Sequence, residues 1–410
     1  MGRCKNLFVV LCLTLAFLSP SGVRGASLWV GTWAAAPEYT GQGDMPRTTT
    51  LANCSLREIV RVSLGGDTLR LQLSNEFSQQ PVEIKAMYIA DTKDSCDIDA
   101  STARYLTFAG RKAVTIAPGE AVFSDALRYR LQPLQQLAVT IVYGSVPQNA
   151  TSHRGSRTTS YIMPGVAKPK ARFATTEKVD HWYNIAAIDV LQATAKGTAG
   201  ASPKGAIAIL GNSITDGRGS TTNAQNRWPD ALATALQVQW GVLNLGIGGN
   251  CVVKGGLSEP GVKRFDRDIL GQRGLKAIVI FEGVNDIGES RTGFYEQTAQ
   301  DLMEAYRQFI AKAHERGLKV ILCTLTPFGR SFYSSHFHEA IRLTVNDWIR
   351  TKAEADGIID FDLFVRDPQC PEQLQERYSD DWLHLNPAGY EAMGRYAADC
   401  LKLILPQSGV

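Results

Sequence analysis

The chain has 410 residues, with 43 lysines and arginines against 40 aspartates and glutamates. This near balance of charge gives no argument for a nucleic-acid partner or for binding to an anionic surface. The length suits two domains, or one large domain, each able to bury a hydrophobic core.

The first 25 residues have the pattern of a secretory signal peptide. Arg3 and Lys5 precede an apolar run over residues 7–18, which is too short to cross a bilayer comfortably. Small residues then predict cleavage after Gly25 or Ala26, with a membrane anchor as the alternative interpretation. Since no later apolar stretch of the sequence is long enough to span a bilayer, we expect a secreted or periplasmic mature chain without stable membrane insertion.

Residues 27–195 predict an all-β domain. Their apolar segments are short and often alternate with polar residues, as in Leu69–Leu73. The segments Ile59–Leu64, Leu137–Tyr143 and Ile185–Val190 have the same character. Alternation with period two, with turn residues between the segments, is typical of antiparallel strands, so we expect a β-sandwich or jelly roll.

Residues 196–204 are small, polar and interrupted by glycine and proline, which predicts a linker. Apolar strands and amphipathic helices then alternate over residues 205–406, which predicts a parallel sheet with helices on both faces. The expected strands are Ala206–Leu210, Val242–Leu245, Ala277–Phe281, Lys319–Leu325 and Ile358–Phe361, and the expected helices are Trp228–Gln239, Tyr295–Glu315, His338–Ala355 and Pro387–Ile404.

Six of the eight cysteines follow the signal segment. Because an exported chain meets an oxidising compartment, we predict the disulfides Cys54–Cys96 and Cys370–Cys400. Cys323 lies within an apolar run and is expected to be a buried free thiol. The spacing shows no paired C-x-x-C pattern of the kind that binds zinc, so we expect no metal.

A serine lies directly after the first strand of the α/β region. Ser213 follows Gly211 and Asn212 and precedes a loop that ends at Gly217. This position puts a hydroxyl at the carboxyl edge of a parallel sheet, where open α/β folds bind their ligands. A serine hydroxyl is a weak nucleophile unless a base accepts its proton, so the chain must supply a base elsewhere.

His384 is the candidate base. It lies just before the last helix, three residues after Asp381. One turn can bring that carboxylate to Nδ1 of the imidazole and leave Nε2 free to face a hydroxyl. Asp380 is the alternative orienting carboxylate, and a chance pair of surface residues is the alternative to both.

The remaining histidines carry weaker signals. His336 and His338 lie in an aromatic loop without an obvious acidic neighbour, so we do not expect them to bind a metal. His153 begins a basic segment, residues 153–157, that could reach into the cleft. We interpret this segment as an ordinary basic loop.

Two segments that follow strands could stabilise an oxyanion. The loop Asn244–Asn250 is rich in glycine, and Gly249 can present a backbone N–H at close approach. Asn285 follows the next strand and can donate its side-chain amide. A glycine turn and a helix cap are the ordinary alternatives. Such donors contribute roughly 3–4 kcal/mol each to an acyl-transfer transition state.

Together these segments resemble the conserved blocks of the SGNH hydrolase superfamily, also called the GDSL esterases and lipases. The matching residues are Gly211–Ser213, Gly249, Gly283–Asp286 and Asp381–His384, in the order of the family's nucleophile, glycine, asparagine and acid–base blocks. The resemblance covers about residues 205–404. Asn212 departs from the family pattern, which usually has aspartate there, but this residue is not the nucleophile.

The resemblance implies a flavodoxin-like three-layer α/β/α fold and ester hydrolysis without a metal or cofactor. It implies that Ser213 is the nucleophile, that His384 is the base and that Asp381 orients it. It also implies an oxyanion hole made by the N–H groups of Ser213 and Gly249 and the side chain of Asn285. The first half is similar to the β-domain of some secreted bacterial SGNH esterases, where it binds glycan or forms a wall of the cleft.

We therefore expect a secreted serine esterase that removes short acyl groups, acetyl above all, from carbohydrate or another small ester. One alternative is a broad-specificity esterase or lipase acting on acyl lipids. A second is a non-catalytic glycan-binding protein on a hydrolase scaffold. The α/β-hydrolase elbow is disfavoured, because Thr215 occupies the position of the second glycine in Gly-x-Ser-x-Gly.

Overall fold

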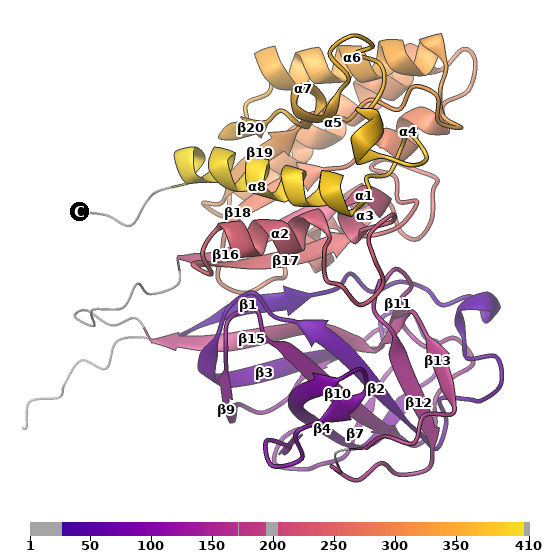
Figure 1. Cartoon of the computed structure of the whole chain (residues 1–410), viewed down its shortest axis with the longest axis vertical. Helices are drawn as coiled ribbons and strands as arrows, with labels where there is room; N and C mark the ends of the chain where they lie inside the picture. The colour runs from indigo at the N-terminus through magenta and orange to yellow at the C-terminus, as the bar shows by residue number, and fades with distance from the viewer. Residues whose placement is uncertain (1–26, 171, 194–203, 406–410) are drawn as a thin grey trace, which may run out of the picture.

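The computed structural model describes residues 27–170, 172–193 and 204–405. The expected signal peptide, and all but the last residue of the expected linker, lie outside the described residues. The described chain forms an antiparallel β region up to residue 193 and an α/β region from residue 204 (Figure 1). An all-β first half and a parallel sheet in the second half agree with the expected fold class.

Two antiparallel sheets make up most of the β region. The smaller has the order β1–β15–β3–β8, with β9 also paired to β3. The larger has the order β13–β12–β2–β10–β4–β5, with β6 and β7 also paired to β4, and β11 and β14 form a separate pair. The strands are β1 (Ser27–Ala34), β2 (Cys54–Arg61), β3 (Gly66–Ser74), β4 (Val82–Asp94), β5 (Asp97–Ile98), β6 (Arg104–Leu106), β7 (Val114–Ile116), β8 (Ala121–Phe123), β9 (Leu127–Leu131), β10 (Gln136–Tyr143), β11 (Ser152–His153), β12 (Ser160–Pro164), β13 (Glu177–Val179), β14 (Trp182–Tyr183) and β15 (Ile185–Ala193).

The alternating sequence of β3 explains which face of its sheet is buried. Leu69, Leu71 and Leu73 are fully buried, whereas Arg70 and Gln72 between them are partly exposed. The three leucines belong to the same core cluster as apolar residues of β2 and β10 in the other sheet. A shift of one residue would expose all three leucines, so the hydrophobic pattern fixes the register.

Five parallel strands form the sheet of the α/β region, in the order β17–β16–β18–β19–β20. The strands are β16 (Gly205–Gly211), β17 (Trp240–Gly246), β18 (Leu275–Phe281), β19 (Lys319–Cys323) and β20 (Gly357–Ile359). The first strand along the chain is second in this order, so the direction of winding reverses beside β16. Open α/β sheets bind ligands at the carboxyl ends of the strands at such a reversal.

Helices cover both faces of this sheet. α2 connects β16 to β17 in one direction along the sheet, whereas α5 connects β18 to β19 and α6 connects β19 to β20 in the other direction. Because such crossovers are right-handed, α2 lies on one face of the sheet and α5 and α6 lie on the other. α8 packs against α2 (Figure 1). None of the described helices is long and apolar enough to cross a membrane. The helices are α1 (Ser213–Asp216), α2 (Trp228–Ala235), α3 (Gly261–Arg264), α4 (Val284–Gly288), α5 (Tyr295–His314), α6 (His336–Thr351), α7 (Phe361–Val365) and α8 (Pro387–Ile404), with a π-helical turn η2 (Phe265–Ile269) and the 3-10 turns η1 (Gln42–Asp44) and η3 (Glu376–Tyr378).

The ends of two expected helices move for local reasons. α2 ends at Ala235, before the predicted end, because Gln237 and Val238 have left-handed φ angles of 55° and 53°. α6 begins two residues before the predicted start, because Ser335 caps it and accepts the N–H of His338. α8 has the predicted bounds.

The β region covers an edge of the parallel sheet. β17 is an edge strand, and β1 packs beside it (Figure 1). Val242 N donates to Ser63 Oγ at 3.0 Å, and Gly31 N donates to the carbonyl of Arg273 at 3.0 Å. A Cβ at Gly241 would lie 2.0 Å from the carbonyl oxygen of Gly31, so this approach requires glycine. The unpaired groups that an edge strand presents are thereby shielded.

All six cysteines of the described residues are free, so the predicted disulfides Cys54–Cys96 and Cys370–Cys400 are wrong. β10 pairs with both β2 and β4, and this pairing puts Cys54, at the start of β2, level with the first residues of β4. Cys96 follows the other end of β4, which ends at Asp94. Cys400 is half-buried on α8, and Cys370 is exposed in a loop. Cys323 is buried and free, as predicted.

Candidate active site

The turn after β16 positions Ser213. Asn212 caps α1, since its Oδ1 accepts the N–H of Ile214 at 3.0 Å. Ser213 is the first residue of α1, and its own N–H has no acceptor in the described part of the chain. A Cβ at Gly211 would lie 2.2 Å from Thr215 Oγ1, so the sharp turn requires glycine there. Ser213 is 7% exposed and lines a cavity.

The loop before α8 brings His384 and Asp381 to this serine. Ser213 Oγ lies 2.8 Å from His384 Nε2, and His384 Nδ1 lies 2.7 Å from Asp381 Oδ2. The other carboxylate oxygen of Asp381 accepts the backbone N–H groups of His384 and Leu383 at 2.7 and 3.0 Å, which fixes the carboxylate. Asp380, the alternative partner, is exposed and pairs with none of the described residues.

Burial and neighbouring charges set the protonation states of this pair. Burial lowers the pKa of His384, and the positive charges of Arg218 and Arg157 lower it further against the opposing effect of Asp381. Burial alone would raise the pKa of Asp381, but hydrogen bonds from the side chain and backbone of His384 hold it below its usual value. At neutral pH the imidazole is neutral and the carboxylate is ionised. Nδ1 then carries the proton, and Nε2 can accept the hydroxyl proton of Ser213.

N–H donors from three places face the same cavity. The first is the N–H of Ser213. The second belongs to Gly249, whose φ of 69° is left-handed and whose N–H has no acceptor among the described residues. Asn285 Nδ2 donates to the carbonyl of Asn250 at 2.7 Å, and Tyr333 Oη donates to Asn285 Oδ1 at 3.1 Å. These two bonds fix the amide and leave its second N–H free. The sequence-predicted oxyanion donors therefore lie around one cavity with Ser213.

Comparison with known families agrees with this geometry. The profile of the GDSL-like lipase/acylhydrolase family matches residues 209–392. The α/β region belongs to the SGNH hydrolase superfamily. We call it the hydrolase domain, and its general reaction is the hydrolysis of esters.

Several solved structures match about half of the chain. A GDSL-like lipase from Bacteroides thetaiotaomicron is 18% identical, with a TM-score of 0.38, over 49% of this chain and 90% of that protein. The lipase/acylhydrolase from Enterococcus faecalis is 21% identical, with a TM-score of 0.38, over 50% of this chain and 99% of that protein. No curated protein matches the sequence significantly.

A buried arginine, which the sequence does not reveal, supports the loops of the hydrolase domain. Arg264 donates to Asn250 Oδ1 at 2.8 Å and to the carbonyls of Leu245 and Gly211 at 2.8 and 3.1 Å. It thereby ties the ends of β17 and β16 to the glycine loop. Glu282 lies 3.6 Å from it, and burial raises the pKa of Glu282 well above its usual value.

The cavity in front of Ser213 is shared by the β region and the hydrolase domain. Its volume is about 440 Å³. Its lining from the β region is Glu38, Asp44, Arg154, Gly155, Arg157 and His181, and its lining from the hydrolase domain is Ser213, Asp216, Arg218, Gly248, Gly249, Leu257, Asn285, Phe332, Tyr333, Leu383 and His384. Because residues of the 153–157 segment line the site, its interpretation as an ordinary basic loop is wrong.

His153 links this segment to the helix that carries the serine. Its Nε2 lies 3.0 Å from Oδ1 of Asp216, the last residue of α1, and its Nδ1 lies 2.9 Å from the carbonyl of Ala36. Burial alone would lower the pKa of His153, but Asp216 and then Glu38 raise it above its usual value. The protonated ring donates on both sides, so a buried ion pair connects the β region to α1.

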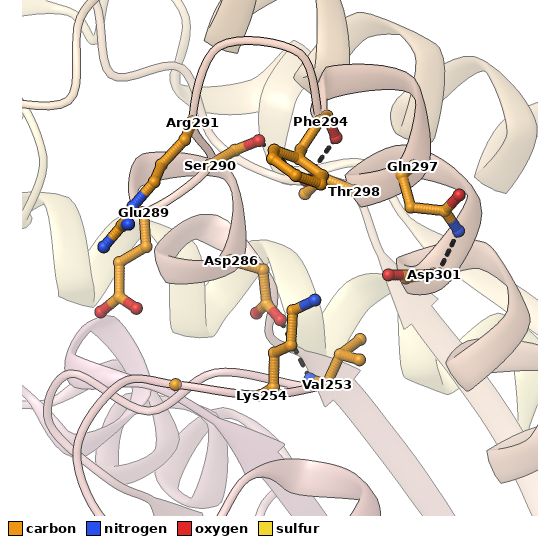
Figure 2. A pocket seen from close by; sticks show the side chains of 11 residues that line it. Val253, Lys254, Asp286, Glu289, Ser290, Arg291, Phe294, Gln297, Thr298 and Asp301 are labelled. Atoms are coloured by element: carbon orange, nitrogen blue, oxygen red, sulfur yellow. Dashed lines mark hydrogen bonds between the residues drawn. The ribbon is translucent and has the colours of Figure 1, made fainter.

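A second cavity, of about 330 Å³, lies beside α4 (Figure 2). Asp286 accepts the N–H groups of Val252 and Val253 at 2.7 and 3.0 Å, and burial raises its pKa to about 6. In Figure 2 this carboxylate points to the Val253 backbone, and the Phe294 ring lies across the cavity. Asp286 therefore anchors the chain after the glycine loop to the helix that carries Asn285.

The two histidines expected in the aromatic loop lie in the first turn of α6, and His336 is exposed. His338 Nδ1 lies 2.8 Å from the carbonyl of Tyr333, and its Nε2 lies 3.1 Å from the carbonyl of Ser290. His338 thus holds the loop that carries Tyr333, whose hydroxyl bonds Asn285. Across the described ranges, no three histidine, cysteine or acidic side chains are grouped as a metal site requires.

Proposed function

We propose that the protein is a secreted serine esterase that hydrolyses short acyl esters, acetyl esters in particular, on carbohydrate. Ser213 is the nucleophile, His384 is the base and Asp381 orients the base. The N–H groups of Ser213 and Gly249 and the amide of Asn285 form the oxyanion hole. The observation that carries the proposal is the pair of hydrogen bonds, 2.8 and 2.7 Å long, that runs from the serine through the histidine to the carboxylate.

The reaction takes place in two steps, acylation of the serine and hydrolysis of the acyl-serine. Ser213 Oγ attacks the carbonyl carbon of the ester while its proton passes to His384 Nε2. The tetrahedral oxyanion collapses, the bond to the alcohol oxygen breaks, and His384 returns the proton to the departing alcohol. Water then attacks the acyl-serine while His384 Nε2 takes its proton. The bond between the acyl carbon and Ser213 Oγ breaks, Oγ regains the proton from His384, and the carboxylic acid leaves. Ionised Asp381 stabilises the imidazolium that forms in each step.

The composition of the cavity supports a short acyl group. Most of its lining is polar, charged or glycine, and the apolar contribution is limited to Leu257, Phe332, Tyr333 and Leu383. A long acyl chain gains its binding energy from apolar contacts along its length, which this lining offers at only a few points. The expected export of the chain favours a carbohydrate as the alcohol.

The competing function is an esterase or lipase on acyl lipids. Phe332 and Leu257 favour it, because these cavity-lining side chains are 76% and 52% exposed, and exposed apolar groups can bind acyl chains. Rates on 4-nitrophenyl esters from acetate to palmitate separate the two functions. We expect kcat/KM to be highest for acetate, and a maximum at long chains would contradict the acetylesterase proposal.

Two further measurements test the mechanism and the substrate. Ser213→Ala should reduce hydrolysis to the uncatalysed background, and activity equal to the wild type would exclude Ser213 as nucleophile. Release of acetate from a panel of acetylated oligosaccharides should identify the sugar. A protein that binds those oligosaccharides but hydrolyses no ester would instead be a non-catalytic glycan-binding protein.

A further inference from the structure

Two arginine side chains in the cavity have donors without acceptors. Arg218 is exposed, and its guanidinium has no hydrogen bond or ion pair within the described ranges. Arg157 lies 3.5 Å from Asp216, but its Nε is buried and has no acceptor. Buried donors without acceptors are rare in native proteins, so this one requires an explanation.

The backbone of Arg157 is held in an unfavourable conformation. Its φ is 50°, in the left-handed region that residues other than glycine rarely adopt. Its carbonyl accepts the N–H of Asn223 of the hydrolase domain at 2.9 Å, which keeps the loop in place. Strain of this kind concentrates at functional sites, where the surrounding structure maintains it. The side chain is 30% exposed and lines the cavity, so the strained loop presents its guanidinium to the substrate space.

Most other charged groups of the cavity neutralise each other. Glu38 is paired with Arg154 at 2.7 Å, and Asp216 is paired with protonated His153 at 3.0 Å. Asp44 lines the cavity too and, within the described part of the chain, has no cationic partner. It adds one opposing charge but cannot satisfy guanidinium donors that it does not contact.

Arg218 and Arg157 line the same cavity as His384. A Cβ at Gly219, the residue after Arg218, would lie 3.7 Å from Cβ of His384, and Arg157 lies 3.5 Å from Asp216, the last residue of the helix that begins with Ser213. In the proposed mechanism the imidazole of His384 gives its proton to the departing alcohol. A group that the arginines bind beside this imidazole would therefore belong to the alcohol and not to the acyl chain.

We propose that Arg157 and Arg218 bind an anionic group, a carboxylate or a phosphate, on the alcohol part of the ester. This inference rests on the proposed esterase function and narrows its substrate. On a carbohydrate, the anion is the carboxylate of a uronic acid that carries the acetyl group or adjoins the sugar that carries it. The planar guanidinium group matches carboxylate and phosphate oxygens with paired hydrogen bonds, which a lysine cannot do.

Matched acetyl esters test the proposal. Methyl O-acetyl-galacturonoside has a carboxylate where methyl O-acetyl-galactoside has a hydroxymethyl group, and acetylglycerol phosphate has a phosphate where acetylglycerol has a hydroxyl. We expect kcat/KM to be about tenfold or more higher for the anionic member of one pair, since a site with unpaired donors rejects the substrate that leaves them unpaired. The pair that shows the preference identifies the anion, and added salt should weaken the preference.

The outcomes separate this proposal from the esterase proposal. Hydrolysis of 4-nitrophenyl acetate without a preference for either anionic substrate would overturn the arginine proposal and leave the esterase function intact. Failure to hydrolyse 4-nitrophenyl acetate and all four matched esters would instead contradict the esterase function.

Variants then test the two residues. Arg218→Gln and Arg157→Gln should each lower the ratio of anionic to neutral kcat/KM about fivefold or more, and Arg218→Lys should recover part of it because the charge returns without the paired donors. Arg395→Gln is the matched control, since Arg395 is exposed on α8 outside the cavity, and it should leave the ratio unchanged. Arg218→Gln should also move the acid limb of the pH profile upward, because it removes a cation near His384. An unchanged ratio in Arg218→Gln would overturn the proposal even if Arg157→Gln does not fold.

Discussion

Asp381→Asn tests whether the carboxylate beside His384 supplies charge and tautomer control. The asparagine can still accept the backbone N–H groups of His384 and Leu383 through Oδ1, so the loop should keep its shape. Its Nδ2 would then donate to His384 Nδ1, which forces the imidazole proton onto Nε2. In that tautomer the histidine cannot accept the hydroxyl proton of Ser213.

The size of the effect follows from the exposure of Asp381. Its side chain is 47% exposed and lies 2.7 Å from a histidine that is only 7% exposed, so the pair sits at the boundary between protein and water. Opposite charges about 4 Å apart attract by about 1 kcal/mol in water and about 4 kcal/mol near a protein surface. Loss of that attraction lowers the rate by about 5-fold to about 10³-fold, and the wrong tautomer adds to it. We expect kcat/KM to fall by about 10²–10³-fold.

Steady-state hydrolysis of 4-nitrophenyl acetate across the pH range is the assay. Asp380→Asn is the matched control, because Asp380 is the adjacent, exposed carboxylate that contacts neither His384 nor the serine. It should retain kcat/KM close to that of the wild type. Equal losses in the two variants, or a loss below about threefold in Asp381→Asn, would refute the reasoning about charge and tautomer.

Further changes probe the donors, the ion pair and the base. Asn285→Ala should lower kcat about 10²–10³-fold with little change in KM, as expected for the loss of one oxyanion donor. Tyr333→Phe removes only the bond to Asn285 Oδ1 and should lower kcat about tenfold or less. Kinetics on 4-nitrophenyl acetate measures both variants, and a larger loss in Tyr333→Phe than in Asn285→Ala would contradict the assignment. His153→Gln should lower the free energy of unfolding in urea by about 3 kcal/mol. The pKa of His153 is raised in the folded state, so the stability that the ion pair contributes is complete below the unfolded pKa and is lost as pH rises through the folded pKa. The difference in unfolding free energy between wild type and variant should therefore shrink in alkali. A difference that stays constant with pH would exclude the ion pair. Because the pKa of His384 is lowered, the acid limb of kcat/KM should lie below pH 6.5, and a limb above that value would contradict it.

The parts of the site that could be predicted each have a local signature. Ser213 follows a buried strand and a glycine, and Asp381 lies three residues before His384, which is one turn of chain. Gly249 lies in a glycine-rich loop after the next strand. Because parallel strands bring their carboxyl ends to one edge, these local signatures were enough to place separate segments around one cavity.

The parts that could not be predicted depend on contacts between distant segments. His153 and Asp216 are 63 residues apart, and neither carries a pattern that distinguishes it from an ordinary loop residue. Arg264 directly follows the exposed Lys263 in the sequence, yet it is fully buried. Periodicity reveals which face of a strand or helix is buried, but not which charged side chain meets another across an interface. The wrong disulfides Cys54–Cys96 and Cys370–Cys400 have the same cause, since spacing along the chain does not say which distant segments lie side by side.

The contacts around α1 explain why the β region is part of the catalytic unit. A helix of only four residues has little stability of its own, so its neighbours must hold it in place. The carboxylate of Asp216 at its end is buried, and a buried carboxylate without cationic partners is strongly unfavourable. The β region supplies both cations, His153 and Arg157, and Gly155 lies so close that a Cβ there would overlap the Asp216 carboxylate. The position of Ser213 therefore depends on side chains of the β region, which favours a role as a wall of the active site over a role as an independent glycan-binding module.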